Sequence, residues 1–249
     1  MIKNTLPPPP DKTKSDYFWL KKPLERVIHY NSYFGKIIRG KTVVDVGCSW
    51  GSETLFLGCY WHPKRIIGVD NYGCDGGVPE NQSRFLENIK KTGNKCVEVM
   101  QADAFDIPLK KGSIDIIIAS QALHHFFDCS QDFRQIRDDD VKCMAKSLKH
   151  WDELLAPDGI VLVRDTYRHC FKRYLGEAFP RFRTQVKYNE KQEPEGWIRL
   201  MEAAGFKLDE LRPYVPYTLR HFTPIVSTRL FNPLVTTFYC MRFSKIQGI

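Results

Sequence analysis

The chain has 249 residues, of which 43% are hydrophobic and 27% are charged, and its formal net charge is +8. These are ordinary values for a globular protein, so we expect a sizeable buried core. No stretch approaches the ~18–20 continuous apolar residues that span a bilayer, and the first residues lack the apolar segment of a secretory signal. The composition therefore excludes a membrane-spanning or secreted protein and predicts a soluble, cytoplasmic one.

The eight cysteines are scattered along the chain and include no C-x-x-C pair. Disulfide frameworks are typical of short secreted chains, and zinc sites need clustered ligands. We therefore expect the cysteines to be small buried hydrophobic residues, and we predict no metal site.

The positive charge is unevenly divided. Residues 1–40 hold 8 Lys/Arg against 3 Asp/Glu, residues 41–163 hold 14 against 18, and residues 164–249 hold 15 against 8. Basic flanks around an acidic middle favour an anionic partner, such as a phosphate, a carboxylate, a nucleic acid or a lipid headgroup. A basic surface that only keeps the protein soluble is the alternative.

The predicted elements begin after a proline-rich tail over residues 1–16. Apolar residues at helical spacing predict a first helix over 17–38. Short β-branched runs then alternate with helical patterns, which is typical of βαβ units and a parallel sheet. Strands are expected at 42–46, 66–70, 96–100, 114–120 and 159–165, and helices at 52–60, 80–91 and 138–151.

The end of the chain has a different pattern. A short amphipathic helix over 195–204 precedes a strand at 206–211, and a last strand is expected at 235–243. Two closing strands with no helix between them predict an antiparallel hairpin at the sheet edge. We expect one domain over 17–249, with a cap formed by three segments, at 17–38, 166–194 and 212–233.

A glycine loop follows the first strand in VVDVGCSWG, where Asp45, Gly47 and Gly51 lead into a helix. The loop has neither the Gly-Lys-Ser/Thr of a Walker phosphate loop nor the G-x-G-x-x-G spacing of nicotinamide enzymes. Asp70 closes the second strand, where a carboxylate can accept hydrogen bonds from ribose hydroxyls. Asp103 ends the third strand. Taken alone, a strand, a glycine loop and a helix could be a structural turn, but the two acids that follow in this order favour a ligand-binding loop.

Several segments together resemble the class I S-adenosylmethionine-dependent methyltransferases, from roughly residue 42 to residue 243. The resemblance implies a Rossmann-like α/β fold with a seven-stranded, mostly parallel sheet, an antiparallel last strand and helices on both faces. It also implies S-adenosyl-L-methionine as cofactor. The segments that carry it are DVGCSWG, IIGVDNY, ADAFDIPL, SIDIIIASQALHH, LLAPDGIVLVRD and EGWIRLMEAAGF.

The resemblance assigns the methionine part of the cofactor to the first loop. Gly47 and Gly51 would line it, with Cys48 as a further contact, and Asp45 would act through its charge near the amino group. A helix-capping role is the alternative for Asp45. The loop departs from the family at Ser49, where a middle glycine is more usual, and this weakens the motif taken alone.

The remaining cofactor contacts follow the next three strands. The resemblance implies that the second strand's end holds the ribose, the third holds the adenine and the fourth completes the site. For the third-strand acid, a plain loop carboxylate is the alternative. The residues are Asp70 and Asn71 for the ribose, Asp103 and Ala104 for the adenine, and Ser120 and Gln121 from the fourth strand.

Methyl transfer needs an aligned acceptor, and an oxygen acceptor usually also needs its proton removed. His124 and His125 follow the fourth strand, and histidine titrates near neutrality. Adjacent residues project differently, so we expect one of the two to face the site, with a merely packed histidine as the alternative for either. Asp165 is a further catalytic candidate, followed by Tyr167 and His169.

The cap segments 166–194 and 212–233 mix Arg and Lys with Tyr, Phe and Pro. Aromatic and cationic side chains suit an aromatic or lipid-like acceptor with an acidic group. They also suit nucleic acid, and a third possibility is that the aromatics form the cap's own core.

We therefore predict a methyltransferase acting on a small molecule, at an oxygen of an anionic or aromatic compound. The alternatives are an RNA or protein methyltransferase, favoured by the basic flanks, and a non-catalytic scaffold that binds S-adenosylmethionine. Against nucleic acid, the sequence has no added RNA-binding module and no Asn-Pro-Pro-Tyr-type tetrad after the fourth strand.

Overall fold

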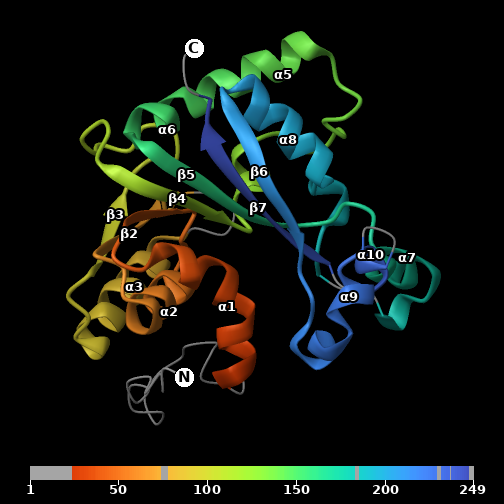
Figure 1. Cartoon of the computed structure of the whole chain (residues 1–249), viewed down its shortest axis with the longest axis horizontal. Coiled ribbons are helices and arrows are strands. Elements are labelled where there is room, and N and C mark those ends of the chain that lie inside the picture. The colour runs from red at the N-terminus through yellow and green to blue at the C-terminus, as the bar shows by residue number, and fades with distance from the viewer. Residues whose placement is uncertain (1–23, 74–77, 183–184, 229–230, 236, 247–249) are drawn as a thin grey trace. The chain divides into compact units, whose positions relative to one another are not determined.

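The structure is a computed structural model that describes residues 24–73, 78–182, 185–228, 231–235 and 237–246 (Figure 1). The expected tail over 1–16 and the first part of the predicted helix 17–38 lie outside the described residues. The chain divides after Ala104 into two compact units. That residues 17–249 form one domain with a cap stays a prediction.

In the first unit, three strands pair in parallel in the order β3-β2-β1. The elements in chain order are α1 (Leu24–Ile38), β1 (Thr42–Val46), α2 (Ser52–Trp61), β2 (Arg65–Asp70), α3 (Pro79–Thr92) and β3 (Val97–Gln101). The β1 residues Val43, Val44 and Val46 are buried, as expected of a parallel strand covered on both faces. Parallel pairing brings the carboxyl ends of all three strands to one edge.

The ends of α3 show how local residues set an element's length. Pro79 occupies the first turn, where its missing N–H is not needed. Gly93 ends the helix with a left-handed φ of 62°, and its N–H donates to the carbonyls of Ile89 and Lys90. These boundaries agree with the helix predicted over 80–91.

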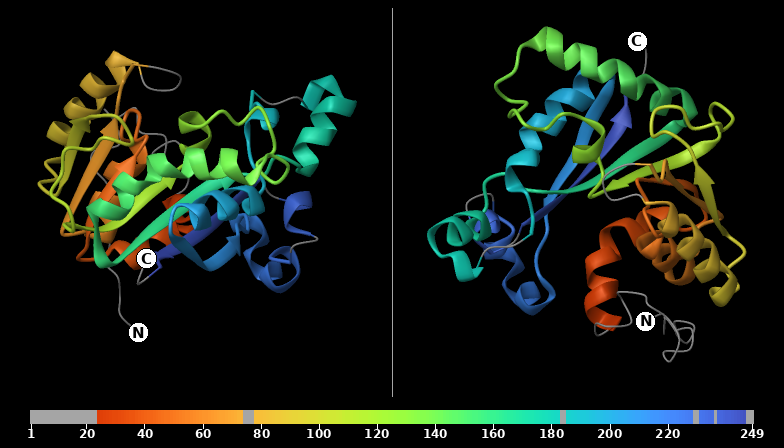
Figure 2. Two further views of the ribbon diagram at one scale, coloured as in Figure 1. Left: turned by 90° about the horizontal axis from the view of Figure 1, so that it is seen from above. Right: turned by 180° about the vertical axis from the view of Figure 1, so that it is seen from behind.

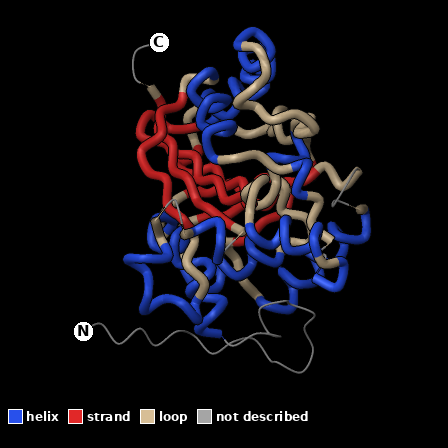
Figure 3. Tube along the Cα trace, turned by 90° about the vertical axis from the view of Figure 1, so that its right-hand side faces the viewer, coloured by secondary structure: helices blue, strands red, loops and turns tan. Residues whose placement is uncertain are grey.

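The second unit contains β4 (Ile114–Ser120), β5 (Leu155–Thr166), β6 (Phe206–Pro213) and β7 (Phe238–Lys245). Their order is β4-β5-β7-β6. β4 and β5 are parallel, whereas β7 lies between β5 and β6 and is antiparallel to both. β6 therefore runs in the same direction as β5, and the loops that follow both strands leave from the same edge. Figure 3 shows the strands in red and the helices in blue.

Helices of the second unit cover this sheet and form the segments beyond it (Figure 2). α8 packs against α5, β6 and β7 through the buried side chains of Trp197, Leu200 and Met201. The helical elements in chain order are α4 (Leu123–Phe126), α5 (Asp138–Ala145), η2 (Lys146–Leu148), α6 (Lys149–Leu154), α7 (Phe171–Ala178), η3 (Pro180–Phe182), η4 (Tyr188–Glu190), α8 (Pro194–Ala203), η5 (Tyr217–Phe222), α9 (Thr223–Val226) and α10 (Asn232–Val235).

Three boundaries in the second unit differ from the sequence prediction. The helix expected over 138–151 is divided by the 3-10 turn η2. β5 begins before the expected residue 159, because the Pro157–Gly159 segment is a bulge between the pairs Ile114↔Leu155 and Ile116↔Ile160. The last strand begins at Phe238 rather than at residue 235, because the chain first forms α10. The expectation of no helix between the last two strands was therefore wrong, since η5, α9 and α10 all lie between β6 and β7.

The described strands nevertheless confirm the predicted fold class. Seven strands, mostly parallel and closed by an antiparallel last strand, alternate with helices as in a Rossmann-like α/β protein. None of the described helices has the length and apolar character needed to cross a membrane.

Candidate active site

The loop that follows β1 turns sharply at three positions. Gly47, Ser49 and Gly51 have φ angles of 74°, 50° and 73°, all in the left-handed region that glycine adopts most readily. A non-glycine residue there costs roughly 1–2 kcal/mol, which explains why the family more often has glycine at the position of Ser49. Here the Ser49 hydroxyl accepts a hydrogen bond from Asn81 Nδ2 at 3.0 Å, and this contact helps to hold the loop.

Asp70 fixes this loop from the end of β2. Its Oδ2 accepts the Ser49 backbone N–H at 2.8 Å, and its Oδ1 accepts the Tyr72 backbone N–H at 2.9 Å. A carboxylate has about four acceptor positions, so these two bonds leave capacity for hydroxyl donors of a ligand. The half-buried Asp70 can therefore hold the loop and bind a ribose at the same time.

Asp45 and Cys48 lie at the base of the loop. The buried Asp45 accepts a hydrogen bond at 2.5 Å from the hydroxyl of Thr54 in the first turn of α2. The Cys48 sulfur lies 3.6 Å from the Tyr72 hydroxyl. Burial, with the carboxylates of Asp45 and Asp70, raises the pKa of the Cys48 thiol well above its usual range. The thiol is therefore neutral and packs beneath the loop.

The other predicted contacts of the first unit follow β2 and β3. Asn71 Oδ1 accepts the Gly73 backbone N–H at 3.1 Å, and the Asn71 carbonyl accepts from Gln101 Nε2 at 3.1 Å. Asp103 is exposed and Ala104 half-buried just beyond β3. The predicted residues of this unit thus gather along the carboxyl ends of its three parallel strands.

The start of α2 fits a polar ligand. Gly51 precedes the helix and provides no side-chain cap for its first N–H groups, which are natural donors to an anion. The Ser52 hydroxyl is buried and has no hydrogen-bond partner among the described residues. A carboxylate such as that of the methionine part of S-adenosylmethionine would satisfy both, so the residues present fit the expected cofactor.

In the second unit, Ser120 and Gln121 lie at the end of β4. Ser120 Oγ accepts from Arg164 Nη2 at 2.7 Å, and Gln121 Oε1 accepts from the Thr166 hydroxyl at 3.0 Å. Gln121 has a left-handed φ of 58°. Its Nε2 is buried without a hydrogen-bond partner in the described part of the chain. This amide is therefore a donor that a ligand could use.

The structure distinguishes the two histidines. The side chain of His124, in α4, is buried, and its Nδ1 lies 3.1 and 3.3 Å from the two carboxylate oxygens of Asp165. His125 is exposed, and its ring centroid lies 4.2 Å from that of His124. The pair forms because β4 and β5 are parallel neighbours, so the residues that follow β4 meet the end of β5.

Buried groups around Asp165 respond to its charge. Burial and the Asp165 carboxylate raise the pKa of the Cys129 thiol to about 12. Burial lowers the pKa of Lys191, and Asp165 partly offsets that effect. Burial and Asp165 also raise the pKa of Tyr239, whose ring centroid lies 4.7 Å from that of Tyr167. Asp165 is thus a fully buried acid within a mixed polar and aromatic cluster.

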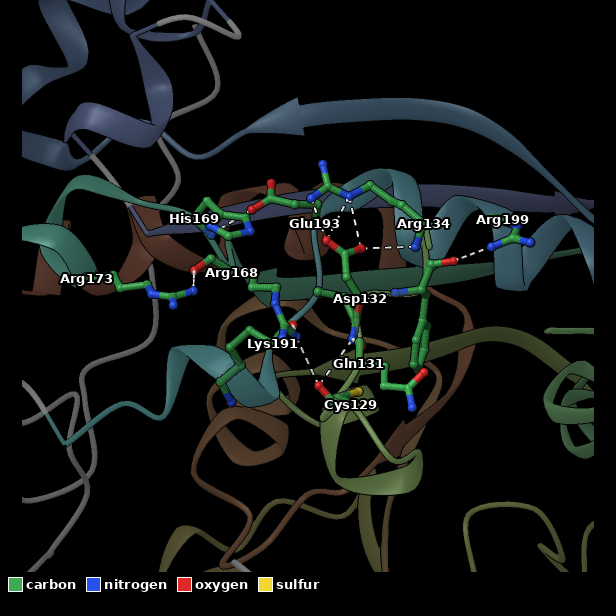
Figure 4. A network of polar contacts seen from close by, with 12 residues as sticks. Cys129, Gln131, Asp132, Arg134, Arg168, His169, Arg173, Lys191, Glu193 and Arg199 are labelled. Atoms are coloured by element: carbon green, nitrogen blue, oxygen red, sulfur yellow. Dashed lines mark hydrogen bonds and ion pairs between the residues drawn. The ribbon is translucent and has the colours of Figure 1, made fainter. Parts of the chain in front are cut away.

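A network of hydrogen bonds holds the loop after α4 against residues 168–193 (Figure 4). Arg168 donates through Nη1 to the carbonyls of Cys129 and Lys191, at 3.1 and 3.0 Å, and through Nη2 to that of Ser130 at 3.0 Å. The fully buried Gln192 accepts the Phe133 backbone N–H at 2.8 Å and donates to the Gln131 carbonyl at 2.6 Å. These side chains replace regular secondary structure in fixing the loop.

A cavity of about 520 Å³ lies beside this network. Arg168, Arg173 and His169 line it together with Asp132, which is paired through both carboxylate oxygens with Arg134. Burial and the nearby arginines lower the pKa of His169, so its imidazole is neutral near neutral pH. Asp132 is paired with Arg134 and Arg173 with Glu177, so the guanidinium of Arg168 gives the cavity its positive character.

Sequence reasoning missed Lys191, Gln192 and Arg168. All three were counted only as polar residues of the expected cap, because no motif distinguishes a buried polar side chain from an exposed one. The described residues contain no cluster of three His, Cys, Asp or Glu that could hold a metal ion.

A model of a methyltransferase domain family matches residues 19–211. An S-adenosylmethionine-dependent methyltransferase from Aquifex aeolicus has a similar structure, with 15% identity, coverage of 90% of this chain and 94% of that one, and a TM-score of 0.59. One from Mesorhizobium loti has 14% identity, coverage of 86% and 97%, and a TM-score of 0.53. No curated protein matches in sequence.

A third similar structure is a chain from the complex between the Haloferax volcanii Trm112 methyltransferase activator and a methyltransferase. It has 16% identity, covers 91% of this chain and 92% of that one, and has a TM-score of 0.58. The family match extends over most of the chain and includes every residue proposed from the glycine loop to Asp165. This chain therefore belongs to the methyltransferase domain family and is an S-adenosylmethionine-dependent methyltransferase, with S-adenosyl-L-methionine as its cofactor.

Proposed function

We propose that this methyltransferase transfers the methyl group to an oxygen of a small molecule that carries an acidic group. The buried pair of His124 and Asp165 is the observation that carries the proposal. An imidazole held by a carboxylate is the usual arrangement of a general base. Nitrogen acceptors that are already neutral amines need no such base before they attack.

His124 would take the proton of the acceptor hydroxyl. Its Nδ1 faces Asp165, so Nδ1–H donates to the carboxylate and the lone pair of the neutral ring is on Nε2. As Nε2 gains the proton, the carboxylate stabilises the imidazolium that forms. The bound cofactor supplies an electrophilic methyl group, and the alignment of acceptor and methyl contributes the rest of the rate.

The acidic group would bind in the cavity lined by Arg168 and Arg173. Arg168, which lines the cavity, donates to the backbone carbonyl of Cys129, and Cys129 follows α4, the helix that carries His124. A guanidinium suits a planar carboxylate or a phosphate. The basic excess of residues 164–249 supports the same choice of an anion.

We also propose the cofactor contacts predicted from the sequence. The bonds that Asp70 makes to the loop, the unsatisfied Ser52 hydroxyl and the unsatisfied Gln121 amide support them. The proposed contacts are Asp45, Gly47, Cys48, Gly51, Asp70, Asn71, Asp103, Ala104, Ser120 and Gln121.

The acceptor class can be tested with S-adenosylmethionine labelled in its methyl group. Three matched sets of compounds would be offered: hydroxy acids, the same acids as methyl esters, and the corresponding amino acids. We expect label in the hydroxy acids, little in the esters and little in the amino acids. Equal transfer to esters would contradict the acidic group, and preferred transfer to amines would contradict the oxygen acceptor.

The alternative acceptors, RNA and protein, are favoured by the same basic excess of residues 164–249. Total RNA and a protein extract would be offered under the same conditions. If the label became soluble after ribonuclease or protease treatment and no small molecule were methylated, the acceptor would be RNA or protein, respectively, and the proposal would be wrong. RNA binding should in addition weaken steeply as salt is raised.

A further inference from the structure

Large apolar side chains are exposed in two segments of the second unit. Nine of the twelve exposed large hydrophobic residues that the structure describes fall within residues 171–186 and 222–234. Several are more than half exposed, including Phe222 at 58%, Ile225 at 56% and Phe179 at 52%. We name the nine the apolar patch: Phe171, Tyr174, Phe179, Phe182, Val186, Phe222, Ile225, Phe231 and Leu234.

The two segments lie together. α7 contacts α10, and Asn232 of α10 donates through Nδ2 to the carbonyl of Val226 in α9 at 3.3 Å, so the helices that carry the apolar patch are linked to one another. Figure 1 and the right-hand panel of Figure 2 show α7 beside α9 and α10 at one end of the second unit. These helices are short, and the exposed residues stand near their ends and in the turns between them. Monomeric soluble proteins seldom expose so much clustered apolar surface without a use for it.

Three exposed cationic side chains lie within or beside the two segments of the apolar patch. Lys172, Arg181 and Arg220 are exposed, and none of them forms an ion pair with a residue that the structure describes. The guanidinium of Arg181 lies 4.9 Å from the ring centroid of Phe182, and that of Arg220 lies 4.1 Å from that of Tyr217. Residues 211–249 contain five Lys/Arg and no Asp or Glu.

We propose that the apolar patch binds to the surface of an anionic lipid bilayer. Phe, Tyr, Ile and Leu side chains can enter the boundary between headgroups and acyl chains, while Lys and Arg contact the lipid phosphates. Short elements that lie on the membrane suffice for this mode of binding, and α7, α9 and α10 are short elements that carry exposed apolar side chains. It goes beyond the proposed function, because it does not depend on which atom is methylated.

The residue types favour a bilayer over nucleic acid. Aliphatic Val186, Ile225 and Leu234 cannot stack on bases as aromatic rings do, yet each is well exposed. Entering the hydrocarbon of a bilayer removes these side chains from water, and each buried methylene adds to the binding free energy. The absence of acidic side chains over residues 211–249 matches a partner that is uniformly negative, as the cytoplasmic face of a membrane is.

Sedimentation with lipid vesicles tests this proposal on the full chain. Vesicles of phosphatidylcholine alone would be compared with vesicles that also contain phosphatidylserine. We expect the protein to bind the anionic vesicles, to bind the neutral ones weakly, and to be released from the former as salt is raised. The double variant Phe222→Ser/Ile225→Ser should lose at least about tenfold in vesicle affinity, because both side chains leave the hydrocarbon.

Two further variants make the test specific. Leu86→Ser removes an exposed apolar side chain of α3 in the first unit, and it should leave vesicle binding unchanged. Arg181→Glu with Arg220→Glu should remove the preference for phosphatidylserine. Circular dichroism and calorimetric binding of S-adenosylmethionine would verify that each variant is folded.

The possible contrary outcomes are distinct. No binding to either vesicle, or an equal loss in Leu86→Ser, would overturn the proposal. A dimer in light scattering that Phe222→Ser/Ile225→Ser dissociates would make the apolar patch an interface between copies of the chain. Salt-sensitive binding to RNA, lost in the Arg variants and absent with vesicles, would assign it to nucleic acid.

Discussion

In the two units, the candidate residues that bond to one another are separated by different distances along the sequence. In the first unit, Asp70 bonds to Ser49 across 21 residues and Asp45 to Thr54 across nine. In the second unit, His124 meets Asp165 across 41 residues, and Gln192 reaches Phe133 across 59. The first set lies on one strand, the loop and helix that follow it, and the end of the next strand. The second set depends on loops and insertions that only the folded sheet brings together.

This difference corresponds to a division of tasks within the family. A cofactor shared by all members can be held by a short and repeatable loop, whereas an acceptor that varies among members is met by variable segments. We therefore expect substitutions in the first unit to change cofactor affinity, and substitutions around Asp165 to change the rate or the stability of the second unit.

The largest expected effect is on catalysis. His124→Ala should lower kcat by about 10²–10⁴, which is the usual contribution of a general base. Its affinity for S-adenosylmethionine, measured by calorimetry, should stay close to that of the wild type. His125→Ala is the matched control, because His125 is exposed, and it should retain activity within a few-fold. Equal losses in the two variants would show that neither histidine is the base.

The next effect is on stability. Gln192→Ala leaves the Phe133 N–H and the Gln131 carbonyl without their partner, and the loss should be about 2–4 kcal/mol in the free energy of unfolding. Urea denaturation measures it. Gln185→Ala, at an exposed position, should be neutral. A neutral Gln192→Ala would show that the loop after α4 is held by other contacts.

Cofactor affinity should respond to Asp70. Asp70→Asn removes a charged acceptor, and we expect a loss of about 10–100-fold in affinity for S-adenosylmethionine. At saturating cofactor, kcat should change little, in contrast to His124→Ala. Glu87→Gln on the exposed face of α3 is the control and should bind normally. If Asp70→Asn lowered kcat without changing the affinity for S-adenosylmethionine, the first unit would not be specific to cofactor binding as we expect.

The smallest effect concerns pH. Burial raises the pKa of Glu193 above its ordinary value of 4.5. The folded state therefore holds this proton more tightly than the unfolded state, and the contribution of Glu193 to stability falls as pH rises from 4.5 through the raised pKa.

Glu193→Gln cannot lose a proton, and its side-chain oxygen can still accept the His169 backbone N–H. The variant should gain stability relative to the wild type between about pH 4 and about pH 8. Urea denaturation at the two pH values checks the sign. A difference that stays constant with pH would show that Glu193 does not titrate in this range.

Much of the first unit could be predicted from the sequence because its signals are local. β-branched runs, Gly93 and the glycines of the first loop each act within a few residues. Even the departure at Ser49 was visible, although only its left-handed φ shows why glycine is usual there.

The second unit was less predictable for a physical reason. The choice between His124 and His125 depends on where Asp165 lies on the neighbouring strand, and a pattern within one segment carries no such information. The bulge at Pro157–Gly159 has the composition of a helix-ending turn, and only its pairing with β4 shows that it belongs to β5. Buried Gln192 resembles any polar residue of a loop.

The position of β7 between β5 and β6 has a consequence for biosynthesis. β6 leaves the ribosome before β7, yet it cannot pair with β5, because their shared partner does not yet exist. Until residues 238–245 emerge, β5 keeps an open edge at Asp165, the residue that pairs with Tyr239. An open edge is a site of mispairing between chains. We therefore expect β5, the strand that carries Asp165, to be the last part of the nascent sheet that needs protection by chaperones.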